Sequence, residues 1–125
     1  MRPGESGRNE QHAMSQAYDR DKLVELFGND PHTLAEVERE FIDTARGAER
    51  EIIATDDLAT IARVAHRLKG ASGMIGAVAL RQIAEAVERA AKAEDLPSVR
   101  RLHGMFSQEV RRAAEQAGVV EDPQA

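Results

Sequence analysis

The chain has 125 residues, with 17 basic and 22 acidic side chains, a net charge of −5 and no cysteine. This length fits one domain, the lack of cysteine excludes disulfides and cysteine-ligated zinc, and the acidic balance argues against nucleic acid as a partner. Aromatic residues are scarce and no apolar run reaches membrane-spanning length, so we expect a helical, cytoplasmic protein that does not bind membranes.

The two ends of the chain differ from its middle. Residues 1–17 are polar, contain Gly4 and Gly7 and show no periodicity, so we predict a disordered N-terminal arm. Residues 118–125 are similar and predict a flexible tail. Residues 18–117 remain as one folded domain.

The first predicted helix is short and the second is long. Residues 19–27 form a short helix that Asp19 can cap and Gly28 ends. Asp30 and Pro31 then suit the N-cap and first position of a long helix. Its apolar residues recur at intervals of three and four along one face: Leu34, Val37, Phe41, Ala45, Ala48 and Ile52.

Three further helices follow, separated by short connections. The third begins at Leu58, with Thr55 or Asp56 as its cap, and runs into the segment "AHRLKGASGMIG". The fourth spans about 78–93, and a break at 94–97 precedes the last one. Four long amphipathic helices predict an all-α, antiparallel up-down-up-down four-helix bundle, with the short helix over one end.

His66 stands out on the third helix. The apolar stripe there contains Leu58, Ile61, Ala65, Leu68, Ser72 and Ile75. At about 100° per residue, His66 lies roughly 130° from its centre and should face solvent. Its helix-surface neighbours are Ala62, Lys69, Gly70 and Gly73, with Arg63 and Arg67 at the flanks. A nucleophilic imidazole would thus stand on a smooth, basic patch that a second protein could approach.

Other features have ordinary interpretations. A lone histidine is usually a simple surface or core residue, and we assign no role to His12, His32 or His103. Gly73 and Gly76 also fit a helix end. The carboxylate pairs Glu36/Glu40 and Glu85/Glu88 can be solvated faces. No Walker loop, dinucleotide fingerprint or paired Glu-x-x-His motif is present, so the sequence predicts no metal site.

The segment "AHRLKGASGMIGAVAL" resembles the signature of histidine-containing phosphotransfer (HPt) domains. That pattern has a histidine, a lysine three and a glycine four residues later, and small residues leading to a glycine. Here these are His66, Lys69, Gly70 and Gly76. The resemblance extends over about residues 19–117. Glu88 sits where family members often carry Gln or Glu near the phosphorylated histidine.

The resemblance implies a phosphorelay intermediate that is no autonomous enzyme. His66 would accept a phosphoryl group from a receiver-domain aspartate, through Nε2, and pass it to another receiver. Lys69 would assist, and Glu88 or a backbone carbonyl would accept a hydrogen bond from the other ring nitrogen. The partners would be receivers of a hybrid histidine kinase and a downstream regulator. They would supply Mg²⁺, while this chain, as a monomer, would need no cofactor of its own.

Two alternatives come from other functional classes. A helical adaptor could bind a receiver or kinase without carrying phosphate, and a purely structural bundle could dimerise through an apolar stripe. The combination of His66 with Lys69 and Gly70 favours the phosphate carrier. In that interpretation the partner would contact Ala62, Arg63, Arg67, Gly70 and Gly73.

Overall fold

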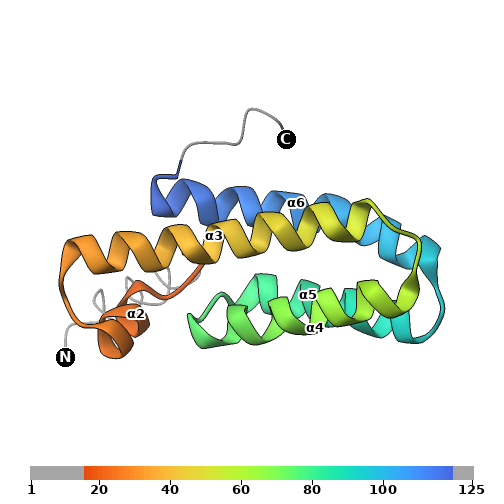
Figure 1. The fold of residues 1–125 in the computed structure, drawn as a ribbon, viewed down its shortest axis with the longest axis horizontal. Helices are drawn as coiled ribbons and strands as arrows, with labels where there is room; N and C mark the ends of the chain where they lie inside the picture. Colours follow the sequence, from red (N-terminus) through yellow and green to blue (C-terminus); the bar gives the residue numbers. More distant parts are fainter. Residues whose placement is uncertain (1–15, 120–125) are drawn as a thin grey trace, which may run out of the picture.

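The computed structural model describes residues 16–119, and in this range the chain forms five α-helices and no strand. They are α2 (Arg20–Phe27), α3 (Pro31–Ile53), α4 (Leu58–Met74), α5 (Val78–Lys92) and α6 (Leu96–Ala117), shown in Figure 1. The predicted all-α fold class is confirmed. Most of the expected arm and tail, together with His12, lies outside the described residues. None of the described helices is long and apolar enough to cross a membrane.

Aspartates begin the helices largely as predicted. The carboxylates of Asp19 and Asp30 each accept a hydrogen bond from the backbone N–H three residues later, which satisfies a donor that the first turn leaves free. The prediction for α4 was wrong, because its N-cap is Asp57 rather than Thr55 or Asp56. The Thr55 hydroxyl instead accepts a hydrogen bond from the Asp57 backbone N–H, at 3.0 Å.

The four long helices surround one core. α3 contacts α4 and α6, and α5 contacts the same two helices; Figure 1 shows them side by side. Buried alanines such as Ala45, Ala65 and Ala84 contribute to this core together with larger apolar side chains. The largest apolar side chains in the core include Leu34, Ile42, Ile61, Leu68, Leu80, Val87 and Phe106.

The short helix α2 is held against the end of α4. The Asp19 backbone N–H donates to the Ile75 carbonyl at 3.0 Å, and Lys22 Nζ donates to the Gly73 carbonyl at 3.3 Å. Gly76 has a φ of +70°, and a Cβ there would lie 2.7 Å from Asp19 Cβ. Gly76 therefore ends α4, as predicted, and also leaves room for the chain that enters α2.

The residues before α2 are anchored by α3 and α6. The backbone N–H of Ala17, the last residue of the expected arm, donates to Gln116 Oε1 at 2.6 Å, and Gln116 Nε2 donates to the Tyr18 carbonyl at 3.0 Å. The Tyr18 hydroxyl donates to the carboxylate of Glu38, which is buried. Burial, reinforced by this carboxylate, raises the pKa of Tyr18 well above its ordinary value.

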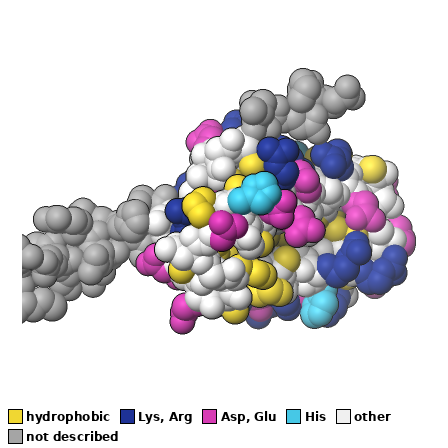
Figure 2. Space-filling view, turned by 60° about the vertical axis from the view of Figure 1, so that its left-hand side comes forward, with side chains coloured by type: hydrophobic (Ala, Val, Ile, Leu, Met, Phe, Trp, Pro, Cys, Tyr) yellow, Lys and Arg dark blue, Asp and Glu magenta, His cyan; other side chains and the backbone are white. Residues whose placement is uncertain are grey.

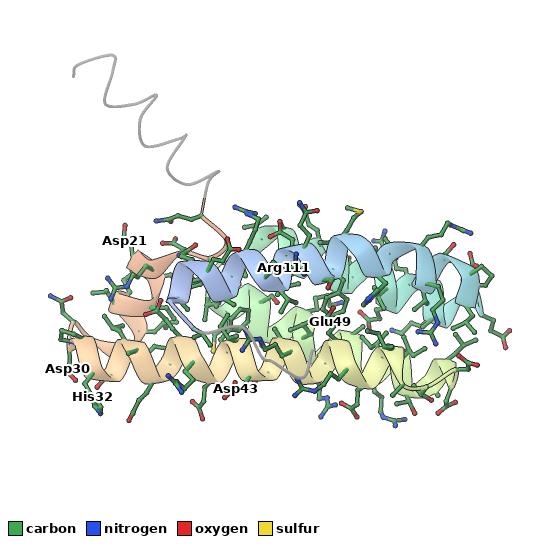
Figure 3. The ribbon with its side chains drawn as sticks, turned by 90° about the horizontal axis from the view of Figure 1, so that it is seen from above. Asp21, Asp30, His32, Asp43, Glu49 and Arg111 are labelled. Carbon is green, nitrogen blue, oxygen red and sulfur yellow. The ribbon has the colours of Figure 1, made fainter. Side chains whose placement is uncertain are left out.

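The outer faces of the bundle carry charged side chains. Figure 3 shows Asp43 on the outer side of α3 and Arg111 on α6, and both residues are exposed. His32 lies near the start of α3, exposed, with Nε2 3.2 Å from Glu36 Oε1. Glu36 and Glu40 are exposed, as a solvated pair should be.

Candidate functional site

His66 projects from the outer face of α4. Ile61, Ala65, Leu68 and Ser72 turn toward the core and are buried, whereas the side chain of His66 is 67% exposed. The prediction that the imidazole faces solvent is therefore confirmed. A reactive group on a partner protein can reach it without any rearrangement of the bundle.

Glu88 on α5 is the hydrogen-bonding partner of the imidazole. His66 Nδ1 lies 2.9 Å from Glu88 Oε2. The carboxyl side chain is only 5% exposed, so the interpretation of Glu85 and Glu88 as a solvated pair is wrong for Glu88. Of the two acceptors considered for the ring, a carboxylate and a backbone carbonyl, the structure contains the carboxylate.

Two lysines bind the same carboxylate. Lys69 Nζ lies 2.8 Å from Glu88 Oε1, and Lys92 Nζ lies 3.1 Å from Oε2. The hydrogen bond from Lys69 is the largest cause that lowers the pKa of Glu88 to about 2; it outweighs burial, which acts in the opposite direction, and Lys92 and His66 add to it. Glu88 is thus an anion at neutral pH.

This ionised carboxylate determines which ring nitrogen is available. A carboxylate can only accept hydrogen bonds, so Nδ1 must donate its proton to Glu88. In the neutral imidazole the other nitrogen, Nε2, then carries the lone pair. The exposed ring can therefore act as a nucleophile through Nε2.

A groove between α4 and α5 adjoins the imidazole. It is lined by Ala62, Arg63, His66, Arg67, Glu88 and Lys92. Arg63 lies 3.4 Å from the Thr60 hydroxyl, and Arg67 reaches Glu51 on α3 at 3.5 Å; both arginines are exposed. Figure 2 shows one face of the molecule, on which basic and acidic side chains are interspersed among apolar ones.

The two glycines that follow His66 on α4 differ in their surroundings. No atom lies within 4 Å of the position that a Cβ on Gly70 would take, so the helix surface there is open. A Cβ on Gly73 would lie 3.3 Å from Arg81 Cδ. The surface at Gly70 is therefore open, whereas at Gly73 the side chain of Arg81 on α5 lies against the helix; the contact of either glycine with a partner stays a prediction.

The structure brings together His66, Lys69 and Glu88 and adds Lys92, which our sequence reasoning missed. A signal was present, because Lys92 follows Glu88 by four residues and must share its helix face.

His103, to which we assigned no role, is half-buried on α6. Within residues 16–119 no group of three or more histidine, cysteine or acidic side chains could hold a metal ion.

Comparison with known protein families gives one result. The model of the family described as "Hpt domain" matches residues 5–117, a range that contains every residue of the site above. No curated protein and no solved structure matches the sequence.

Proposed function

We propose, because this chain belongs to the Hpt domain family, that His66 accepts a phosphoryl group from the aspartate of one receiver domain and passes it to another. Hpt domains are phosphocarriers of two-component signalling that interact with receiver domains; they are not catalysts in their own right. One observation supports the assignment to His66: its exposed imidazole is bound at Nδ1 by a buried, ionised carboxylate.

The transfer step follows from this geometry. The Nε2 lone pair attacks the phosphorus of the receiver's aspartyl phosphate, and an N–P bond forms. The bond between phosphorus and the aspartate oxygen breaks, and the electron pair leaves with the aspartate carboxylate. Such transfers depend mainly on positioning and on stabilisation of charge on the moving group. The return step to a second receiver is the same reaction in reverse.

Glu88 stabilises the ring during this step. Nδ1 keeps its proton while Nε2 bonds to phosphorus, so the imidazole gains positive charge. The carboxylate 2.9 Å from Nδ1 is ionised and can balance that charge through a charge-assisted hydrogen bond. No proton has to leave the ring before the phosphoryl group arrives.

The neighbouring residues suit a docked receiver. Gly70 leaves space beside His66, and Lys69 places a cation in the cluster next to the ring. Exposed Arg63 and Arg67, at the groove that Ala62 also lines, complement an acidic receiver pocket and assist encounter and orientation. Mg²⁺ and its carboxylate ligands would belong to the receiver.

We also propose the up-down-up-down order for the four long helices and a monomeric state for the protein. The contacts of α3 with α4 and α6, and of α5 with the same helices, support that order. The short connections support it too, because a helix that follows a short loop packs antiparallel to the preceding helix.

The function is tested by phosphoryl transfer from a purified, phosphorylated receiver. We expect radiolabelled phosphate on this protein that is labile in acid and stable in base, as a phosphoramidate is. His66→Gln should abolish the label, and His32→Gln, which alters another exposed histidine, should retain it. Label that survives His66→Gln would refute the assignment. A receiver that binds without any transfer would favour the adaptor instead.

A further inference from the structure

The carboxylate of Glu88 has more cationic partners than a hydrogen bond to His66 requires. Lys69 approaches one oxygen and Lys92 the other, and the imidazole shares the second oxygen with Lys92. Lys69 is 29% exposed and Lys92 is 66% exposed. The two ammonium groups together outweigh the single negative charge between them.

A carboxylate beside an imidazole has two opposing effects on a nucleophile. It orients the ring and fixes the proton on Nδ1, which exposes the lone pair of Nε2. An anion this close also favours the protonated ring, and an imidazolium has no lone pair with which to attack. A site that needs a neutral histidine therefore benefits from the hydrogen bond and is harmed by the uncompensated charge.

We propose that Lys92 is a positioning residue that, together with Lys69, compensates the charge of Glu88, so that the carboxylate orients the imidazole of His66 without holding it in its protonated form. Lys92 carries the larger part of this inference, because its ammonium group binds the same oxygen that Nδ1 contacts. The inference rests on the proposed function, since it assigns a purpose to a neutral His66.

The compensation acts selectively on the unproductive state. A protonated but unphosphorylated ring has only Glu88 to balance its charge, so the nearby lysines destabilise it. A ring phosphorylated on Nε2 carries its own anion, the phosphoryl group, and depends less on Glu88. Lys92 thus opposes protonation of the ring more strongly than it opposes phosphorylation.

The other charged groups around the ring do not duplicate this role. From α4, Arg63 and Arg67 are exposed, and each has a polar side-chain neighbour away from Glu88. From α5, Arg89 pairs with Glu85 at 3.3 Å and is turned about 100° along the helix from Glu88. Lys69 and Lys92 are the cations that the described contacts place on the carboxylate bound to His66.

The test is an NMR titration of the His66 ring nitrogens in the full-length protein, with the signal assigned by its loss in His66→Gln. Lys92→Met removes the charge and keeps an unbranched side chain. We expect the protonation midpoint of His66 to move upward by about half a pH unit. Lys92→Arg should restore the wild-type midpoint, and Arg89→Met, a matched change on the same helix, should leave it in place.

A midpoint that stays or falls in Lys92→Met overturns the proposal, and so does an equal rise in Lys92→Arg, because the effect would then not depend on charge. Circular dichroism checks that each variant is folded. The titration needs no receiver, so an unchanged midpoint in Lys92→Met would not affect the assignment of His66 as the phosphorylated residue. Conversely, an absence of radiolabel on His66 would not affect the measured midpoints.

Discussion

Acid should weaken the fold through Glu88, and the substitution Glu88→Gln isolates this effect. The bound cations lower the folded-state pKa of Glu88 to about 2, against an ordinary value of 4.5. Between these two values the unfolded chain takes up a proton that the folded chain refuses. The stabilisation is therefore complete above about pH 4.5 and is lost as the pH falls toward 2. The amide side chain of the variant has no such proton to bind.

The size of the effect follows from the two pKa values. Crossing the whole interval corresponds to about 3 kcal/mol, and about 2 kcal/mol of this is lost between pH 5.5 and pH 3. The side chain of Lys92 is 66% exposed, and solvent screening weakens its share. We therefore expect the wild type to lose about 1 to 2 kcal/mol more than the variant over this range.

Urea unfolding followed by circular dichroism, at intervals from about pH 5.5 to about pH 3, measures both free energies of unfolding. The pKa values of Asp57 and Asp95 are lowered too, by hydrogen bonds from Thr60 and Ser98 respectively. These groups affect both proteins alike, so the difference between wild type and variant reports Glu88. If the free energies of unfolding of the two proteins fell equally with pH, Glu88 would not be held as an anion in the folded state. The conclusion that Nδ1 of His66 donates to it would then fail as well.

The remaining predictions concern three glycines. Gly70→Leu should leave the melting temperature nearly unchanged, because its Cβ meets open space, but should slow transfer from a phosphorylated receiver by at least about tenfold; an unchanged rate contradicts the docking role. Gly76→Ala should destabilise the fold by about 2 to 4 kcal/mol, since φ is +70° and the new Cβ meets Asp19. Gly47→Ala is the matched control, because no atom lies within 4 Å of the new Cβ in this helical position, and it should leave the melting temperature unchanged or raise it. Equal changes in melting temperature for the two alanine variants would contradict the special role of Gly76.

The helices and the orientation of His66 were predictable because both depend on local periodicity. Aspartate caps, Pro31 and the spacing of apolar residues mark the helix boundaries within one or two residues. The angle between His66 and the centre of the apolar stripe of α4 is enough to place the imidazole on the outer surface of the bundle. Buried Glu38 escaped the same reasoning. The carboxylate of Glu38 accepts a hydrogen bond from the Tyr18 hydroxyl and lies 3.7 Å from Arg20 Nε, and the periodicity of α3 alone predicts neither contact.

The chemistry of the site was only partly accessible from the sequence. The spacing of His66, Lys69 and Gly70 lies within one helix and could be recognised directly. The state of Glu88 depends on how close α4 and α5 approach and on which lysines reach its oxygens, and periodicity within one helix does not determine either. Lys92 could have been found by asking which residues share the face of Glu88.

The hydrogen bonds between the side chain of Gln116 and the backbone of Ala17 and Tyr18 constrain the order in which the fold can form during synthesis. Ala17 and Tyr18 leave the ribosome early, but the side chain that binds their backbone is made 99 and 98 positions later. Helices α3 to α5 can associate before that residue exists, and the Tyr18 hydroxyl can already bind Glu38 on α3, whereas the hydrogen bonds of Gln116 cannot form until α6 is nearly finished. A chain interrupted within the last turn of α6 would therefore keep the contacts of His66 with Glu88 and of Tyr18 with Glu38, and would lose the hydrogen bonds of Gln116 to the backbone of Ala17 and Tyr18.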